Sequence, residues 1–548
     1  MSLEDGTRGQ DGPAGLAGPS SAPPVTTPAP VDDGSSGAAA PPSAKRWWSL
    51  TGLCLAAAIV WFAAANLPIA STAIADDLGG SVTQLQWANT IFTLVTGALV
   101  IAAGRFGDIF GRRKVLDLGL VLFAAASVVA AVAPNVTVLI AGRALMGVAA
   151  AAILPATLAI IPIEFRGKEQ VIAFSAWMAV AGVGQAAAPA ISGALTTALS
   201  WRAIFWVDVP VCAAAFALVL FTTSESRDEG ASHHIDYAGL VTVAAGLVAL
   251  LYALNEGPTL GWDHPLVIGS AVLAVVLLAA CILIERRVKD PLIDLGLFKR
   301  HSFDGALIDN FVYNITLAGT MYVLALYLEQ VRGYDALTAG LLLLPSTVSM
   351  LVFIPIGARI ELRRGPRFPL ATGTLIMGIG TFLAGFLAVD TPYWWYALAI
   401  FIQGVGIGLF STPLSDTAVG LAPPAESGAA SGAFKMCSMV GGAFGVAIMG
   451  AVYRGIELSH LQADAAAANL TPDQQRLVND AFASSEKAKE IYQTLAPDVQ
   501  KQVVDAVHAA LSSGIGGSLK LSAVFALGAL VAVLLLVPKG ILHADRQS

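Results

Sequence analysis

Charged residues are scarce in this sequence: Asp, Glu, Lys and Arg together make up only 13% of its 548 residues. Soluble domains carry about 25% charged residues, which face the surrounding water. Hydrophobic residues make up 56% of the chain. This composition excludes an ordinary soluble protein and predicts a membrane protein, whose lipid-facing side chains are apolar.

Cysteine is scarce as well, and the motifs of several classes of enzyme and pump are missing. Cys54, Cys212, Cys281 and Cys437 all lie in apolar stretches without metal-ligand spacing, so we expect them to pack as small apolar residues. The sequence has no Walker loop, no GxSxG elbow, no HExxH motif and no zinc-type Cys/His cluster. We therefore expect no enzymatic activity, no cofactor, no metal and no nucleic-acid partner.

Long apolar stretches are what the sequence does contain. About 20 apolar residues are enough to cross the hydrocarbon core as a helix. Fourteen such stretches are predicted, at 50–70, 86–104, 115–133, 137–161, 170–195, 203–222, 236–254, 265–284, 304–328, 336–358, 369–389, 393–421, 428–453 and 516–538. The predicted fold class is an all-α membrane protein with fourteen transmembrane helices.

The placement of Lys and Arg predicts the orientation of these helices. With the N-terminus in the cytoplasm, the inner loops and adjoining helix ends carry twenty Lys and Arg residues, whereas the short outer loops carry only Arg202 and Arg332. Positive residues accumulate on the cytoplasmic side of membrane proteins. We expect a multi-pass monomer in a bacterial cytoplasmic membrane, with both termini cytoplasmic.

The chain divides into parts by composition and by the positions of its apolar stretches. The predicted parts are a disordered cytoplasmic N-terminus at 1–44, a first six-helix bundle at 45–222, two extra helices and linkers at 223–302, a second six-helix bundle at 303–540 and a cytoplasmic tail at 541–548. The polar stretch 454–515 is predicted to be a helical hairpin outside the membrane. Thr471 and Pro472 are typical of a helix start, and a second helical run begins at Ala496-Pro497-Asp498.

Two loops of the sequence resemble each other. The loop after the second span begins with Gly104 and has Asp108 four residues later, and the loop after the tenth span begins with Gly357 and has Glu361 four residues later. Duplicated halves are typical of secondary transporters, whose substrate site lies near the bilayer midplane between the halves. The repeat therefore predicts a transporter that works by alternating access.

The first of these loops carries the strongest motif, formed by Gly104, Asp108, Gly111, Arg112 and Arg113. Asp108 can pair with Arg112 and point at a helix N-terminus, where negative charge is favoured. Such a contact can form in one state of a transporter and break in the other. The alternative interpretation is a merely basic turn between two helices.

The motif at 104–114 resembles the signature loop of the major facilitator superfamily, and further segments agree. Residues 139–147 resemble its fourth-helix motif, 184–193 its fifth-helix antiporter motif, and 201–210 and 427–445 the sixth and thirteenth helices of fourteen-helix drug:proton antiporters. The resemblance covers nearly all of 48–540. It implies the major facilitator fold, with two six-helix bundles and two extra linker helices, and export driven by the proton gradient.

The antiporter motif fits only in part, and a family acid is missing. Gly184, Pro189 and Gly193 match the motif, whose small residues permit close packing and whose Pro permits a bend, whereas two of its glycines are replaced. Ordinary small-residue packing is the alternative. Relatives usually carry an Asp in the first helix where this sequence has Ala63, so any proton coupling must depend on residues elsewhere.

We single out five ionisable residues within the predicted spans: Arg143, Asp208, Asp309, Asp416 and Lys435. Ionisable residues are costly in a membrane and are functional candidates by default. Asp309, Asp416 and Lys435 fall at similar depth in the second bundle, so we hypothesise that Lys435 neutralises one acid and that the other binds the transported proton. A fixed structural ion pair is the alternative.

The resemblance implies a gating or proton-relay role for Arg143, and the alternative is a packing Arg bonded to backbone carbonyls. Asp208 is a weaker coupling candidate, because the sixth span is peripheral in this fold.

The small-molecule substrate is expected in an apolar pocket with a few polar points. The candidate lining residues are Asn66, Asn310, Phe311, Tyr313, Asn314 and Gln403. The predicted function is proton-coupled export of amphipathic, drug-like molecules. A transporter of a specific metabolite or lipid-like compound, including a symporter, and a non-transporting sensor or scaffold remain as alternatives.

Overall fold

A computed structural model of the chain describes residues 43–79, 82–227, 236–288, 301–334, 336–388, 391–420, 422–423, 426–467 and 497–538. Within these ranges the secondary structure is helical, as predicted. The predicted disorder of the N-terminus falls on residues outside the described ranges, apart from residues 43 and 44, and so does the predicted tail at 541–548.

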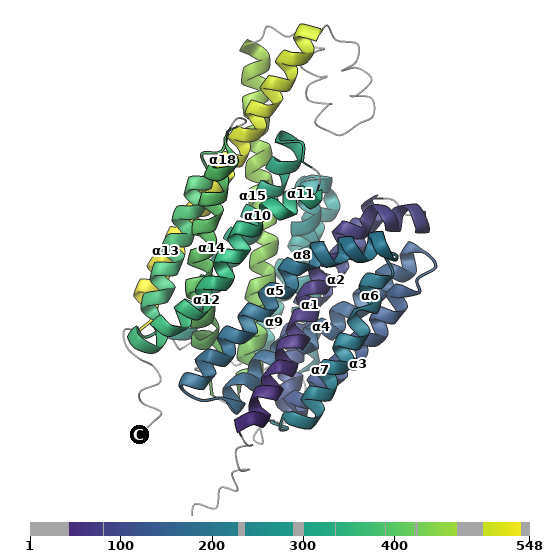
Figure 1. Ribbon diagram of the computed structural model, residues 1–548, viewed down its shortest axis with the longest axis vertical. Coiled ribbons are helices and arrows are strands. Elements are labelled where there is room, and N and C mark those ends of the chain that lie inside the picture. The colour runs from purple at the N-terminus through teal and green to yellow at the C-terminus, as the bar shows by residue number, and fades with distance from the viewer. Residues whose placement is uncertain are drawn as a thin grey trace, which may run out of the picture. The chain divides into compact units, whose positions relative to one another are not determined.

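The first bundle is built from the N-terminal helices, drawn in purple and blue in Figure 1. They are α1 (Ser43–Leu78), α2 (Val82–Phe110), α3 (Arg112–Ala131), α4 (Val136–Glu164), α5 (Lys168–Ala198), α6 (Ala203–Trp206) and α7 (Asp208–Thr222). Two further helices follow, α8 (Tyr237–Leu260) and α9 (Pro265–Glu285).

The second bundle is drawn in green and yellow in Figure 1. Its elements are α10 (His301–Leu326), η2 (Tyr327–Val331), α11 (Ala336–Leu342), α12 (Leu344–Arg364), α13 (Arg367–Ala384), α14 (Tyr393–Ser415), η3 (Asp416–Gly420), α15 (Ser427–Ala467) and α18 (Pro497–Leu536).

Thirteen helices within the described residues are long and apolar enough to cross a membrane. The remaining predicted span corresponds to α10, which is long enough but carries Asp304, Asp309, Asn310 and Asn314. These polar residues lower its hydropathy, yet α10 packs against α15 and α18 inside the second bundle. With α10, the observed helices match the fourteen predicted spans.

The polar stretch 454–515 is described only at its two ends. α15 continues without a break to Ala467, and α18 begins at Pro497, where the sequence predicts a helix start. α18 then runs directly into the last predicted span, so this part is an extension of a spanning helix. The other predicted helix of this stretch, after Pro472, lies outside the described residues.

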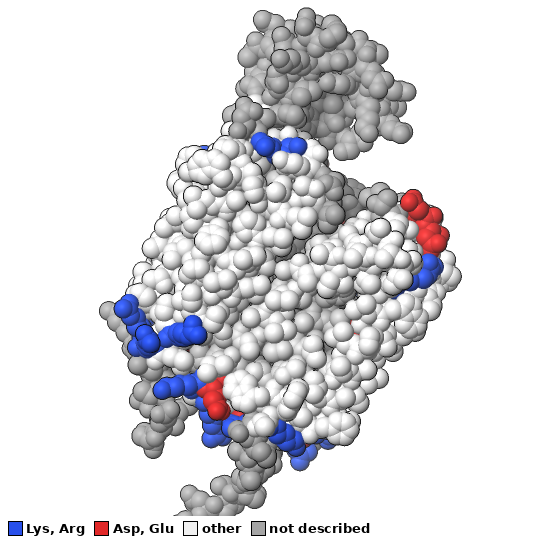
Figure 2. All heavy atoms as spheres, viewed as in Figure 1, with Lys and Arg blue, Asp and Glu red and all other residues white. Residues whose placement is uncertain are grey.

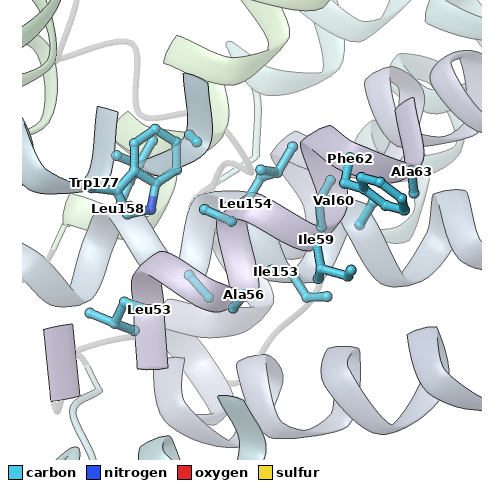
Figure 3. Packing of buried hydrophobic residues seen from close by; sticks show 14 of the residues in the cluster. Leu53, Ala56, Ile59, Val60, Phe62, Ala63, Ile153, Leu154, Leu158 and Trp177 are labelled. Carbon is cyan, nitrogen blue, oxygen red and sulfur yellow. The ribbon is translucent and has the colours of Figure 1, made fainter. Parts of the chain in front are cut away.

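Apolar packing between α1, α4 and α5 forms the core of the first bundle. Figure 3 shows Ile59 of α1, Leu154 and Leu158 of α4, and Trp177 of α5 within one cluster of buried side chains. Trp177 is fully buried there. This close packing limits displacement of the three helices relative to one another.

The two bundles repeat one pattern of helix neighbours. In the first bundle α1 packs against α5 and α7, and α4 packs against α2 and α3. In the second bundle α10 packs against α15 and α18, and α14 packs against α12 and α13. This correspondence confirms the internal duplication and makes Asp108, near the end of α2, the counterpart of Glu361, near the end of α12.

The extra helices α8 and α9 form a hairpin beside the bundles. α8 packs against α9 and also against both α2 and α15, which belong to different bundles. Tyr252 of α8 stacks on Trp87 of α2 with 5.7 Å between ring centroids. The hairpin therefore covers one of the two seams between the bundles.

Basic residues gather at one end of the helices, which we call the basic end. This end contains the start of α1, the α2–α3 turn and the α12–α13 turn, and Figure 2 shows most of the Lys and Arg of the visible face there. The middle of that face is almost free of charge. An uncharged belt between polar ends is typical of a protein embedded in a bilayer.

Candidate functional site

The two bundles meet along two seams, α2 against α15 and α5 against α12. On the first seam, α2 and α15 touch backbone to backbone near the basic end. A Cβ on Gly104 would collide with the Gly428 backbone, and a Cβ on Gly428 would collide with the Asp108 carboxyl. Only glycine permits this approach. We call the region where the bundles meet at the basic end the joint.

Asp108 connects the bundles at the first seam. Its fully buried carboxylate accepts hydrogen bonds at Oδ1 from Arg112 Nε at 3.0 Å and Nη2 at 2.6 Å. The backbone N–H groups of Gly428 and Ala429, in the first turn of α15, donate to its two oxygens at 3.0 and 2.8 Å. We call these four residues the first latch. It contains the ion pair and the helix N-terminus that the sequence predicts, and the helix dipole favours this position of the carboxylate.

The rest of the signature loop is fixed within the first bundle. Gly111 has φ of 112°, a left-handed conformation that favours glycine. Arg113 donates to the carbonyl oxygens of Leu220 and Thr223 at the end of α7, and the Glu225 carboxylate accepts from the N–H groups that begin α3. Glycine and arginine of this motif thus hold the turn, while Asp108 reaches across to the other bundle.

Gln170, Glu361 and Asp416 form a second connection, which we call the second latch. Gln170, in the first turn of α5, donates from Nε2 to Asp416 Oδ1 at 2.5 Å and to the Gly420 carbonyl oxygen at 3.2 Å. The Asp416 carboxyl interacts with the carboxyl of Glu361 near the end of α12, and each acid is 2% exposed. Two buried carboxyl groups that face each other repel when both are ionised, so this contact favours a proton on one of the two acids.

Sequence reasoning selected Asp416 but missed Glu361 and Gln170 as site residues. The repeated Gly-to-acid spacing was the available signal for Glu361, because it placed that acid where Asp108 lies in the first half. Gln170 had no signal of its own. It lies at the start of α5, which is the counterpart of α15 in the duplicated pattern of neighbours.

Lys435 does not pair with an acid, so the hypothesis that it neutralises Asp309 or Asp416 is wrong for this structure. Among the described residues it forms no salt bridge; its Nζ instead lies over aromatic rings. The distances to the ring centroids are 4.7 Å for Trp177, 5.4 Å for Trp61 and 5.4 Å for Phe434. The side chain points from α15 toward the first bundle rather than toward the other helices of its own bundle.

Further contacts complete the joint. Ser427 and Ser431 of α15 donate to the carbonyl oxygens of Ala159 and Pro155 of α4, at 3.3 and 2.9 Å. All the contacts described here lie near the basic end. They are mainly polar or backbone contacts, which water can replace when the bundles separate.

Comparison with known proteins agrees with this architecture. The family model described as the Major Facilitator Superfamily matches residues 53–446. The chain belongs to the Major Facilitator Superfamily. The resemblance drawn from the signature loop is thereby confirmed.

Relatives within the superfamily include drug-resistance proteins. The puromycin resistance protein pur8 of Streptomyces alboniger is 35% identical over 429 residues, which cover 77% of this chain and 84% of that protein. The quinolone resistance protein NorB of Staphylococcus aureus is 32% identical over 408 residues, covering 74% and 88%. The human organic anion transporter MFSD10 shares the fold, with a TM-score of 0.57 at 14% identity, over 90% of this chain and 100% of that one.

Arg143, in the fourth-helix motif of the superfamily, is fully buried and bonded to backbone and amide oxygens. It donates to the carbonyl oxygens of Ala63 and Ala88 at 2.9 and 3.1 Å and to Asn89 Oδ1 at 3.3 Å, and it lies over the Phe92 ring. This is the packing arrangement that the sequence analysis gave as the alternative to a relay. The carbonyl of Ala63, where relatives carry an acid, is one of its acceptors.

The other two predicted acids are buried within single bundles. Asp208 begins α7 and accepts from Ser127 at 3.0 Å, whereas Asp309 of α10 accepts from Thr374 of α13 at 3.1 Å. The second carboxyl oxygen of each has no hydrogen-bond partner among the described residues. Neither acid contacts the other bundle through these bonds, so neither belongs to the joint.

The antiporter-motif helix α5 lies against α1. A Cβ on Gly184 would collide with the Ala58 backbone, so this glycine is required for the close packing of α5 on α1. Gly193 has a looser environment, in which a Cβ would lie 3.7 Å from Ile69. Pro189 lies inside α5, which remains one helix from Lys168 to Ala198. Small-residue packing therefore accounts for Gly184.

The predicted substrate residues do not form one cluster. Asn310 donates to Phe434 O and Ser438 Oγ of α15, and Gln403 of α14 donates to Thr381 of α13, so both stabilise the second bundle internally. Asn314 donates back to Asn310, and Asn66 is buried without a hydrogen-bond partner among the described residues.

The two aromatic candidates also pack within the second bundle. Phe311 of α10 packs on Phe444 of α15 with 5.8 Å between ring centroids. Tyr313 of α10 packs on Phe410 of α14 with 5.0 Å between ring centroids.

Proposed function

We propose that this protein exports small amphipathic, drug-like molecules by alternating access, with protons moving in the opposite direction. The observation that carries the proposal is the joint. Two bundles of the superfamily fold are held together at one end by buried contacts that break and reform without disturbing the core of either bundle. Two relatives are named for resistance to puromycin and to quinolones. These names support export of drugs rather than import of a nutrient.

The second latch is the proposed site of proton coupling. With the joint closed, the buried carboxyl pair of Glu361 and Asp416 holds one proton. When the bundles separate, Gln170 moves away with α5 and water reaches both acids. Two hydrated carboxylates at neutral pH release that proton. After the drug-loaded joint has closed, the pair takes up a new proton from the side to which the passage then opens. This assignment replaces the Lys435 pairing expected from sequence.

The basic end is proposed to face the cytoplasm of a bacterium, because Lys and Arg accumulate on that side of membrane proteins. Opening of the joint then exposes the passage to the cytoplasm, from which a drug enters. Closing it directs the drug to the other side. A proton released at this end moves inward, which is the direction in which the proton gradient supplies energy.

The experiment is a drug-accumulation assay in a bacterial strain that lacks its own pumps. Cells expressing the protein are expected to accumulate less puromycin and less of a quinolone than cells with an empty vector. A protonophore should abolish the difference. Accumulation above the control would indicate an importer, and equal accumulation of a broad drug panel would indicate a protein that does not transport drugs.

A matched variant tests the coupling within the same assay. Glu361→Gln keeps the shape and a hydrogen-bond donor but cannot carry the proton. We expect it to reach the membrane at wild-type abundance and to lose the protonophore-sensitive part of efflux. Full retention of that part in Glu361→Gln and in Asp416→Asn would reject the second latch as the coupling site.

A further inference from the structure

Lys435 is a buried cation held by aromatic faces. Its Nζ lies 4.7 Å from the ring centroid of Trp177 and 5.4 Å from that of Trp61, and the residue is only 4% exposed. Both tryptophans belong to the first bundle, on α5 and α1, whereas Lys435 is on α15 of the second bundle.

No carboxylate among the described residues balances this ammonium group through a salt bridge. Burial of an isolated ammonium is costly, and attraction to the electron-rich face of an indole ring is the main contact that offsets it here. Indole gives the strongest attraction to cations of the aromatic side chains. The pair Trp61 and Trp177, which we call the aromatic cage, therefore has the chemistry of a cation-binding site.

The cage is intact without Lys435, because its walls lie on helices of one bundle. α1 and α5 pack directly on each other, and Gly184 of α5 touches the Ala58 backbone one turn before Trp61. Trp177 is fixed by complete burial in the core drawn in Figure 3. Trp61 is half-buried, which leaves that wall open on one side.

Lys435 leaves the cage when the joint opens. Gly428, Ser431 and Lys435 follow each other at spacings of three and four residues, so they lie along one face of α15. Gly428 and Ser431 contact Asp108 and Pro155 of the first bundle. A movement that breaks these contacts also withdraws Lys435, and the cage is then vacant on the side from which a drug enters.

We propose that the aromatic cage of Trp61 and Trp177 is a binding site for lipophilic organic cations, and that Lys435 occupies it in the closed state as a tethered competitor. The proposal rests on the proposed export function and names a substrate class for it. A ligand with a diffuse positive charge and apolar substituents matches two indole faces in an apolar surrounding. Closure of the joint returns Lys435 to the cage and displaces the bound cation toward the opposite side.

The test is equilibrium binding of tetraphenylphosphonium to the full-length protein in lipid nanodiscs. Lys435→Met keeps the length of the side chain and removes its charge, so the cation competes with no internal partner. We expect this variant to bind tetraphenylphosphonium roughly tenfold more tightly than the wild type. Lys435→Arg, which also lies well on an indole face, should bind like the wild type.

Substitutions of the cage tryptophans should weaken the binding of tetraphenylphosphonium, whereas Lys435→Met should tighten it. Trp61→Leu is expected to weaken binding roughly tenfold, and Trp177→Phe to weaken it by a smaller factor. Lys520→Met is the matched control, because Lys520 lies 4.6 Å from the ring centroid of Phe386 within the second bundle, away from the joint. That variant should bind tetraphenylphosphonium with unchanged affinity.

Tetraphenylborate separates a cation site from a simple opening of the protein. It has the same shape and the opposite charge, so only an effect confined to the phosphonium supports the cage. Equal tightening of both ions in Lys435→Met, or no change in either, would overturn the proposal and leave Lys435 as a closing contact only. The drug-accumulation assay is scored separately, so a protein that binds the cation without exporting any drug would refute the export function instead.

Discussion

The first and second latches occupy equivalent positions in the two duplicated halves but have different chemistry. In the first, Asp108 is balanced by the permanent positive charge of Arg112 and by two N–H groups of α15. In the second, the equivalent acid Glu361 interacts with another buried acid, Asp416. One contact is complete with every carboxylate ionised, and the other requires a proton.

This difference shows how two duplicated contacts can respond differently to protonation. An Arg–carboxylate pair at a helix N-terminus needs no added proton to form, because the guanidinium remains charged. A pair of carboxyl groups holds only while one of them is protonated. On the proposed mechanism, the first latch stabilises the joint at any state of protonation of the second, and the second latch makes closure depend on proton supply.

Removal of the first latch should have the largest effect on stability. Asp108→Ala removes the carboxylate of a buried ion pair with Arg112, which typically costs about 3–5 kcal/mol. We expect a strong decrease in the unfolding midpoint of the purified protein and loss of drug efflux. An unfolding midpoint equal to that of the wild type would show that Arg112 finds another partner and that the latch contributes little.

A smaller defect is expected from crowding the same contact. Gly428→Ala places a methyl group against the Asp108 carboxyl and should cost about 1–3 kcal/mol. Gly442→Ala, on the same helix, is the control, because its Cβ would lie 3.7 Å from Ala318, an ordinary contact. The unfolding midpoints of both variants are measured by thermal unfolding. A larger decrease for Gly442→Ala than for Gly428→Ala would contradict the role of the close contact at Gly428.

The second latch should show the reverse pattern, a small effect on stability and a large effect on pH dependence. Glu361→Gln replaces one donor with another and should change stability by less than about 1 kcal/mol. In the wild type, closure should weaken as the pH rises, because the shared proton is lost. In the variant, closure should be independent of pH.

Distances between spin labels at the basic ends of α5 and α12, followed across pH, measure this closure. A wild-type protein whose label distances do not respond to pH would contradict the role of the second latch.

The smallest effect is expected at the end opposite the joint. Asp77 lies beyond the membrane span of α1, and hydrogen bonds from Arg202 and then from Trp201 lower the pKa of its carboxyl. A lowered pKa in the folded state contributes stability that is fully present above the unfolded value of about 4, and this contribution is lost as the pH falls from there through the lower, folded value. Asp77→Asn should therefore cause only a slight loss of stability at neutral pH, measured as the unfolding midpoint, and none in strong acid.

Much of the architecture could be predicted from sequence, because the spans follow from local hydropathy and their orientation follows from the positions of Lys and Arg. The spans, the duplication and the contact between Asp108 and Arg112 all depend on the spacing of residues in the sequence. α10 was recognised as a span despite its acids, since its 26 residues, most of them apolar, exceed the length needed to cross a bilayer.

The partners of the buried charges could not be predicted in the same way. Depth in the membrane placed Asp309, Asp416 and Lys435 at one level, but successive residues of a helix point about 100° apart. Asp309 thus faces Thr374 of α13, while Asn310 next to it bonds to α15. Depth in the membrane does not specify the direction in which a side chain points around its helix axis. For this reason Lys435 was predicted to pair with an acid, whereas it lies over tryptophan rings.

The hairpin of α8 and α9 makes the two seams between the bundles unequal. Because α8 contacts both α2 and α15, a lipophilic compound dissolved in the bilayer meets a helical wall on that side. On the other side, α5 and α12 meet without such a cover from this hairpin. A substrate that arrives from the lipid is therefore expected to enter beside α5 and α12. The hairpin of α8 and α9 would block entry on the side of α2 and α15.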